Sequence, residues 1–322
     1  MSEIVLQVED LHTSFFTKNG EVKAIDGISF FVREGETFGI VGESGCGKSV
    51  TALSILRLLP EPGGRITGGK IIFEGTDLLG LSKKKMRAYR GRMISMILQD
   101  PMSSLNPVYT IGDQIGESVR LHQGLPDNMV QPEVISALRL LRIPTPEMIL
   151  RDYPFQLSGG MRQRVVGAVA MSCHPRLLIA DEPTTALDAT IQAQYIALFK
   201  DIQKKTNIAI IFITHDFGVI GQMCHRVGVM YAGKIVETAT TRELFKAPRH
   251  PYTSALIHSV PSLDRKDERL YSIEGQPPSL LNLPPGCRFA PRCSVAQDVC
   301  RTQEPPEVDI GNNHSVSCWK VK

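Results

Sequence analysis

The sequence predicts an α/β fold built around a largely parallel sheet. Short aliphatic runs alternate with helical patterns from the start of the chain to about residue 250. Continuous apolar runs such as 177–180 are typical of strands covered on both faces, as in a parallel sheet. The 322 residues, 42% hydrophobic and 21% charged, suffice for about two domains with a large core.

Eight stretches are expected to be strands, and one block between them is expected to be helical. The strands are 5–8, 30–32, 37–41, 70–73, 94–98, 177–180, 208–213 and 226–231. Between about 100 and 170 strand signals vanish and apolar residues follow a helical period. This block is predicted to be a helical insertion in a domain that covers residues 1–255.

A glycine-rich turn follows the strand at 37–41 and precedes a helical pattern at 50–59. Its sequence, GESGCGKS at 42–49, matches the phosphate-binding pattern in which backbone N–H groups and a helix start surround the phosphates of ATP. Lys48 is expected to reach the β- and γ-phosphates, and the Ser49 hydroxyl to bind Mg²⁺. The nucleotide-binding residues expected here are Gly42, Ser44, Gly45, Cys46, Gly47, Lys48, Ser49 and Val50.

A second nucleotide motif is the apolar run 177–180, which ends in Asp181 and Glu182. Asp181 is expected to support Mg²⁺ through its water shell. Glu182 is placed to orient the attacking water or to act as a general base. Strands often end in acids merely because the chain leaves the sheet, so the catalytic interpretation depends on the upstream phosphate loop.

The segment LSGGM at 157–161, followed by Gln163, resembles the signature loop of the ATP-binding cassette (ABC) family. By this resemblance Ser158, Gly159 and Gly160 contact the ATP of an opposite subunit, so a second ATPase subunit is implied. Taken alone, Ser158 could simply be a helix N-cap.

The same resemblance assigns three further residues. Gln99 resembles the glutamine that contacts Mg²⁺, and His215 resembles the switch histidine that contacts the γ-phosphate. An aromatic residue near the start stacks on adenine, for which Phe15 is preferred and Phe16 is the alternative. Glu182, His215 and Gln99 are therefore the implied catalytic residues.

Within the ABC family, the chain resembles the dipeptide and oligopeptide importers most specifically. Four segments carry this resemblance: 99–107, 181–188, 250–253 and 283–293. The resemblance implies an ATPase subunit on the cytoplasmic face of the cell membrane. Its implied partners are two transmembrane permease subunits, a related or identical ATPase subunit and, indirectly, an extracytoplasmic peptide-binding protein. The insertion near 100–114 is implied to receive the permease subunits. Nickel or sugar import is an alternative.

A second alternative is an ABC ATPase that acts on nucleic acid or ribosomes. The basic cluster at 83–92 allows it, but the net charge of only +3 favours a solvated helix face and no nucleic-acid partner. No apolar run approaches the ~20 residues of a membrane span, and the first residues do not resemble an export signal.

The last part of the chain, 256–322, is expected to be a small irregular domain, because it is rich in proline and lacks helical or strand periodicity. Four of the seven cysteines lie here, separated by five, six and seventeen residues: Cys287, Cys293, Cys300 and Cys318. Four thiolates at such wide spacing favour a [4Fe–4S] cluster over Zn²⁺, with disulfides or free thiols as a further alternative.

Overall fold

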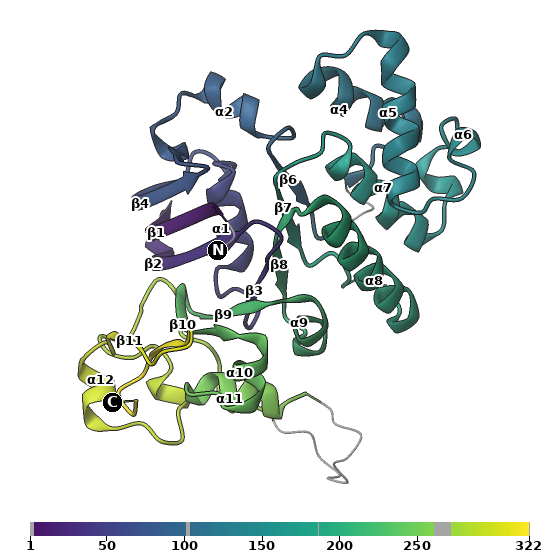
Figure 1. The fold of residues 1–322 in the computed structure, drawn as a ribbon. Helices are drawn as coiled ribbons and strands as arrows, with labels where there is room; N and C mark the ends of the chain where they lie inside the picture. The colour runs from purple at the N-terminus through teal and green to yellow at the C-terminus, as the bar shows by residue number, and fades with distance from the viewer. Residues whose placement is uncertain (1–2, 101–103, 186, 261–271, 322) are drawn as a thin grey trace. The chain divides into compact units, whose positions relative to one another are not determined.

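The computed structural model describes residues 3–100, 104–185, 187–260 and 272–321 (Figure 1). The chain divides into two compact units. Unit 1 comprises the described residues within 1–5, 32–36 and 80–212, and unit 2 comprises those within 6–31, 37–79 and 213–322.

Unit 2 contains most of a four-stranded sheet with the order β2-β1-β4-β5. The long strands β1 (Ile4–Thr17) and β2 (Gly20–Arg33) precede β4 (Gly64–Phe73) and β5 (Thr76–Asp77). β1 and β4 are antiparallel, with Leu6 opposite Phe73 and Phe15 opposite Gly64. Alternating buried side chains such as Leu6 and Val8 form the core face of this sheet.

A second group of strands in unit 2 has the order β11-β12-β10-β9-β3. β3 (Thr37–Val41) pairs in parallel with β9 (Arg226–Tyr231), and β9 is antiparallel to β10 (Lys234–Thr240). Beyond β10 lie β12 (Ser315–Ser317) and β11 (Glu307–Asp309), so the end of the chain extends the sheet.

The helices of unit 2 are short. They are η1 (Leu78–Gly80, at the border with unit 1), α1 (Lys48–Ile55), α9 (Phe217–Met223), α10 (Thr241–Lys246), α11 (Pro251–His258), η3 (Ala290–Arg292) and α12 (Asp298–Thr302). α1 follows β3 directly, which is the strand–turn–helix context that the phosphate-loop prediction requires.

Unit 1 contains β6 (Ile94–Ile97) and β7 (Leu177–Asp181), which pair in parallel, and most of β8 (Ala209–Thr214). Its helices are α2 (Lys83–Tyr89), α4 (Ile111–Gln123), α5 (Asp127–Leu140), α6 (Pro146–Ile149), η2 (Pro154–Gln156), α7 (Gly159–Met171) and α8 (Ala189–Thr206). α4, α5 and α7 pack together, as Figure 1 shows.

The helical block that the sequence predicts at about 100–170 is observed, apart from residues 101–103, which lie outside the described residues. Residue 186 and residues 261–271, which fall in the predicted 181–188 motif and in the predicted C-terminal domain, are likewise outside them. Within the described part of the chain, no helix is long and apolar enough to cross a membrane.

The sequence prediction missed four strands and one helix end. β5, β10, β11 and β12 were not predicted. The helix expected at 50–59 ends at Ile55, because Leu56 is its C-cap and Arg57 adopts a positive φ of 52°.

Candidate functional site

The turn between β3 and α1 has the backbone of a phosphate-binding loop. Gly45 (φ 79°) and Gly47 (φ 112°) both lie in the left-handed region that glycine tolerates. Gly47 is the N-cap of α1, and no side chain caps the helix there. An added Cβ at Gly45 would meet nothing within 4 Å. The uncapped helix start and the open space beside it fit a triphosphate.

Three residues of this turn, Gly42, Cys46 and Lys48, are closely surrounded by other atoms of the chain. Lys48 is 5% exposed, and its Nζ donates hydrogen bonds to the carbonyl oxygens of Gly42 (2.8 Å) and Glu43 (3.2 Å). A Cβ at Gly42 would lie 2.1 Å from the carbonyl oxygen of Met230, so only glycine fits. Cys46 is buried, and burial raises the pKa of its thiol, which therefore stays neutral.

The remaining predicted residues of the turn face outward. Ser44 and Ser49 are exposed and Val50 is half-buried. The Ser49 hydroxyl, at the second position of α1, is thus accessible to a hard cation such as Mg²⁺.

Glu43 has contacts that sequence reasoning did not predict. Its N–H donates to the hydroxyl oxygen of Tyr252 (3.0 Å), and its carboxylate accepts two hydrogen bonds from Arg292 (2.6 and 2.9 Å). These hydrogen bonds raise the pKa of the Arg292 guanidinium further. The resemblance at 250–253 and 283–293 marked both partner segments, but no pattern in the sequence connects them to Glu43.

Unit 2 also carries Phe15, Phe16 and His215. Phe15 is half-buried on β1 opposite Gly64, whereas Phe16 is 48% exposed, with the Arg65 guanidinium carbon 5.6 Å from its ring centre. His215 follows β8 and is exposed. The choice between the two phenylalanines as the adenine-stacking residue stays a prediction.

In unit 1, the end of β7 brings together two of the predicted catalytic residues. The carboxylate of Glu182 accepts hydrogen bonds from Gln99 Nε2 and from the Thr185 hydroxyl, each 3.1 Å long. Asp181 and Glu182 are both buried. Glu182 has a positive φ of 46°, a strained conformation for a residue with a side chain and one that is concentrated at functional sites.

The predicted signature residues lie at the start of α7 in unit 1. Ser158 is the N-cap, and its hydroxyl accepts a hydrogen bond of 3.3 Å from the N–H of Met161. A Cβ at Gly159 would meet no atom within 4 Å, so this helix start is open, whereas one at Gly160 would lie 3.0 Å from Ile191. Buried Gln163 donates to the carbonyl oxygen of Pro183 (2.7 Å), which links α7 to the chain after Glu182.

The four late cysteines line one small cavity, together with Trp319, His250 and Phe289. All four are free thiols, and burial raises the pKa of Cys287, Cys293 and Cys318, so these thiols are neutral. Among the described residues, no group of three or more His, Cys, Asp or Glu is arranged to hold a metal ion. The four sulfurs therefore share one cavity, but the described residues are not arranged as a metal site.

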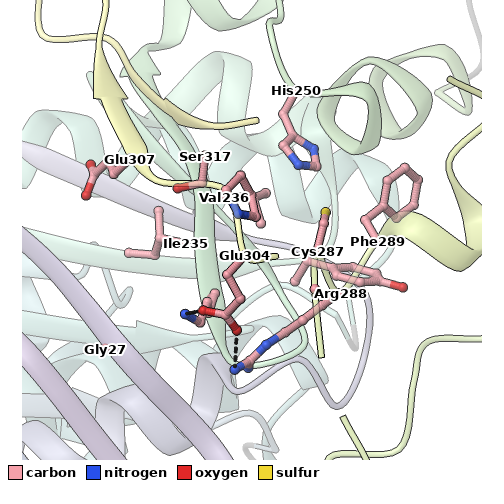
Figure 2. Close-up of a pocket in the computed structure, with 14 residues that line it drawn as sticks. Gly27, Ile235, Val236, His250, Cys287, Arg288, Phe289, Glu304, Glu307 and Ser317 are labelled. Carbon is pink, nitrogen blue, oxygen red and sulfur yellow. Dashed lines mark hydrogen bonds and ion pairs between the residues drawn. The ribbon is translucent and has the colours of Figure 1, made fainter. Parts of the chain in front are cut away.

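A second pocket, of about 150 Å³, is lined by Cys287, by Ile235 and Val236 of β10 and by Ser317 of β12 (Figure 2). Arg288 there is 6% exposed; it pairs with Asp26 and donates to the carbonyl oxygen of Ala232 (2.5 Å). Burial opposes the ionisation of Asp26, but Arg288 outweighs it and lowers the pKa of this carboxyl. Lys234 pairs with Glu304 at 2.5 Å. These charged side chains of the pocket are therefore paired with one another or with Asp26.

Two family models match the chain. The model described as "ABC transporter" matches residues 25–185, which include the phosphate loop, the signature loop and Glu182. The model described as "Oligopeptide/dipeptide transporter, C-terminal region" matches residues 236–300, which include three of the four late cysteines.

Similar curated proteins share the whole length of the chain. The dipeptide transport ATP-binding protein DppD of Bacillus subtilis is 52% identical over 98% of this chain and 95% of its own length. The oligopeptide transport ATP-binding protein OppD of the same organism is 50% identical over 98% of this chain and 88% of its own. A probable peptide ABC transporter ATP-binding protein of Sinorhizobium fredii is 50% identical over 99% of this chain and 96% of its own length.

Solved structures show the same fold. A dimeric post-hydrolysis structure of the ATP-binding cassette MJ0796, with ADP and phosphate, has a TM-score of 0.65 and 22% identity, covering 74% of this chain and 99% of that one. The structure of cbiO1 from Clostridium perfringens has a TM-score of 0.64 and 27% identity. The match covers 76% of this chain and 92% of cbiO1.

Proposed function

Because the chain belongs to the ABC transporter family of ATPases, we propose that it hydrolyses ATP to drive the import of dipeptides or oligopeptides. The observation that carries the proposal is the open glycine turn between β3 and α1, whose uncapped helix start suits a triphosphate. The peptide cargo is supported by the relatives named for dipeptide and oligopeptide transport.

In this proposal the phosphate loop binds the nucleotide. The N–H groups of the turn and the Lys48 ammonium bind the phosphates. Ser49 and Gln99 would hold Mg²⁺, which would neutralise charge on the phosphate oxygens. The ring of Phe15 stacks on the adenine. His215 donates a hydrogen bond to the γ-phosphate, so that several groups of the chain stabilise its negative charge.

Glu182 and the residues around it supply the groups for hydrolysis. Glu182 orients a water molecule for attack on the γ-phosphorus, and the bond to the β–γ bridging oxygen breaks to give ADP and phosphate. The side-chain amide of Gln99 and the hydroxyl of Thr185 donate to the Glu182 carboxylate and fix its direction. Asp181 supports Mg²⁺ through its water shell.

The proposal includes a second ATPase subunit, identical or related, and two permease subunits at the cytoplasmic face of the membrane. Ser158, Gly159 and Gly160 contact the ATP of the partner subunit, and the open space at Gly159 supports this role. An extracytoplasmic peptide-binding protein completes the importer, and no nucleic acid takes part.

We further propose that Cys287, Cys293, Cys300 and Cys318 ligate a [4Fe–4S] cluster, with Zn²⁺ as the alternative. Four cysteine thiols around one cavity are the correct donor set for such a cluster. A cluster accepts wider sulfur spacing than one ion does. Protein prepared without oxygen should be brown and hold about four irons per chain, and Cys287→Ser should lose most of the iron. Colourless protein with one zinc per chain would establish the alternative.

Two substitutions test the nucleotide chemistry. Lys48→Ala should weaken ATP binding itself, because the loop loses its only ammonium. Glu182→Gln should keep ATP binding but lower hydrolysis by about 10²-fold or more, and should trap an ATP-bound dimer that gel filtration detects. The control is Glu117→Gln on α4, an exposed acid of unit 1. Normal turnover of Glu182→Gln would remove the catalytic assignment.

The cargo is tested separately. The chain should co-purify with two permease subunits, and the reconstituted complex should take up labelled di- or oligopeptides in proportion to ATP hydrolysed. Uptake of nickel or a sugar instead would keep the ATPase assignment and reject the peptide cargo. Recovery of nucleic acid in place of permeases would reject transport altogether.

A further inference from the structure

The C-terminal segment contacts the phosphate loop directly through one ion pair. Arg292 donates two hydrogen bonds to the two carboxylate oxygens of Glu43, the residue that follows the first glycine of the loop. The Arg292 side chain is 4% exposed and that of Glu43 is 27% exposed. Two parallel hydrogen bonds from a guanidinium fix both the distance and the orientation of a carboxylate.

Arg292 is itself held from several sides. Its Nε donates to the carbonyl oxygen of Glu274 (3.0 Å), and its terminal nitrogens also reach the carbonyl oxygen of Ile273 and the hydroxyl of Tyr231, each at 3.4 Å. The guanidinium carbon lies 5.9 Å from the centre of the Tyr231 ring. Every guanidinium nitrogen therefore has a partner, and the side chain has a single orientation.

A second contact fixes the backbone of the loop at the same residue. The N–H of Glu43 donates to the hydroxyl of Tyr252 on α11, which is fully buried. Tyr252 packs against Tyr231 and Phe289, with ring centres 4.6 and 5.3 Å apart. Glu43 is thus held through both its main chain and its side chain by residues outside the loop.

The contacts of Glu43 extend to the nucleotide-binding lysine. Lys48 Nζ donates to the carbonyl oxygen of Glu43, so a change in the backbone at Glu43 moves an acceptor of Lys48. A loop that is already ordered loses less conformational entropy when it binds phosphate. Fixing Glu43 therefore favours nucleotide binding without any contact between Arg292 and the nucleotide.

We propose that Arg292 is a positioning residue for the phosphate loop, so that ATP affinity depends on the C-terminal segment through the Arg292–Glu43 ion pair. The inference rests on the proposed nucleotide function. Arg292 also directly precedes Cys293, and its N–H donates to Phe289 in the short turn η3 between Cys287 and Cys293. The segment 287–293 therefore carries two cysteines of the cavity and the arginine that holds the loop.

The test is a double-mutant cycle on the full-length protein, with the affinity for a fluorescent ATP analogue and the KM and kcat of hydrolysis as readouts. Arg292→Gln and Glu43→Gln should each weaken ATP binding on the order of tenfold. The double variant should be no weaker than either single one, because both remove the same pair. KM should rise while kcat at saturating ATP is kept.

The matched control is Arg301→Gln, which removes one exposed arginine from the same segment and should bind ATP like the unaltered chain. If Arg292→Gln does not fold, Glu43→Gln alone carries the test, because it leaves Arg292 and its other contacts in place. Unchanged affinity in the single variants, or additive losses in the double variant, would overturn the inference. Failure of the unaltered protein to bind the analogue would instead overturn the proposed nucleotide function.

Discussion

The carboxylate of Glu237 accepts a hydrogen bond of 2.7 Å from Nε2 of His314, and both side chains are buried. Glu237 lies in the middle of β10, and it also accepts hydrogen bonds from the N–H groups of Arg249 (2.7 Å) and His250 (2.9 Å). One buried acid therefore connects the sheet of unit 2 to the start of α11 and to the C-terminal segment.

His314→Ala should destabilise the protein by about 3 kcal/mol, because it leaves the buried Glu237 carboxylate without the hydrogen bond from the His314 side chain. Urea unfolding at neutral pH measures the loss. The double variant with Glu237→Gln should recover part of it, since no buried charge remains. Arg301→Gln is the exposed control and should unfold like the unaltered chain. A loss for His314→Ala below about 0.5 kcal/mol, the range of ordinary surface changes, would contradict the prediction.

Acid should destabilise unit 2 through His250. Burial lowers the pKa of His250 to about 4, below its ordinary value of 6.5, and its Nδ1 accepts a hydrogen bond from the N–H of Tyr252. The unfolded chain therefore takes up a proton first as the pH falls. The free energy of unfolding is therefore unaffected by His250 above about pH 6.5 and falls as the pH drops from about 6.5 to 4. About 2 kcal/mol is lost by about pH 5.

The matched variant for this prediction is His250→Asn, which can still cap α11 but does not titrate. Urea unfolding at neutral pH and at about pH 5 should show a smaller acid loss for the variant than for the unaltered protein. An equal loss in both would assign the pH dependence to other groups.

Phe15→Ala should weaken ATP binding by roughly 1–3 kcal/mol if its ring stacks on adenine, the magnitude of a base–aromatic contact. Phe16→Ala is the matched variant on the same strand and should change the affinity less than twofold. Titration with ATP and with inorganic triphosphate separates the base contact from the phosphate contacts, since triphosphate binding should be unaffected. The opposite ranking of the two variants would assign the stacking to Phe16.

Gly42→Ala should abolish nucleotide binding, because its Cβ would lie 2.1 Å from the carbonyl oxygen of Met230 and must displace the backbone of β9 or of the loop. Gly45→Ala is the contrast within the same turn: its Cβ meets no atom, and only the positive φ is unfavourable. Gly42→Ala should therefore have a lower ATP affinity and a lower unfolding temperature than Gly45→Ala. Similar behaviour would show that the close contact at Gly42 relaxes without cost.

The sequence predicted the bounds of the mostly apolar strands β3 and β9 to the residue. It missed β10 because Lys234, Glu237 and two threonines interrupt the apolar pattern, although Glu237 is 1% exposed. Glu237 can be buried because three groups donate hydrogen bonds to its carboxylate: the N–H groups of Arg249 and His250 and the ring of His314. These donors lie at least 12 residues away in the sequence, so no local pattern indicates them. β11 and β12 are three residues long and too short to give a periodic signal.

The candidate site was predictable to the extent that it is local. The phosphate loop and the pair Asp181–Glu182 are contiguous motifs, and the structure places each at the end of a strand as expected. The Arg292–Glu43 pair was not predictable, because its members are 249 residues apart and each is an ordinary charged residue in its own segment. The clustering of the four late cysteines in the sequence indicated that they lie near one another, and they do line one cavity. It did not indicate how the four sulfur atoms are arranged around that cavity.

The pairing of β12 with β10 bears on how the protein can be shortened. Glu237 and Thr238 form the register with Val316 and Ser315, so this side of β10 is covered only by residues near the end of the chain. A chain that stops before residue 307 leaves the backbone N–H and C=O groups of β10 open to strands from other molecules. Such truncated protein should self-associate and precipitate, and the outermost strand of the intact chain, with Glu307 and Asp309, carries the like charges that discourage this.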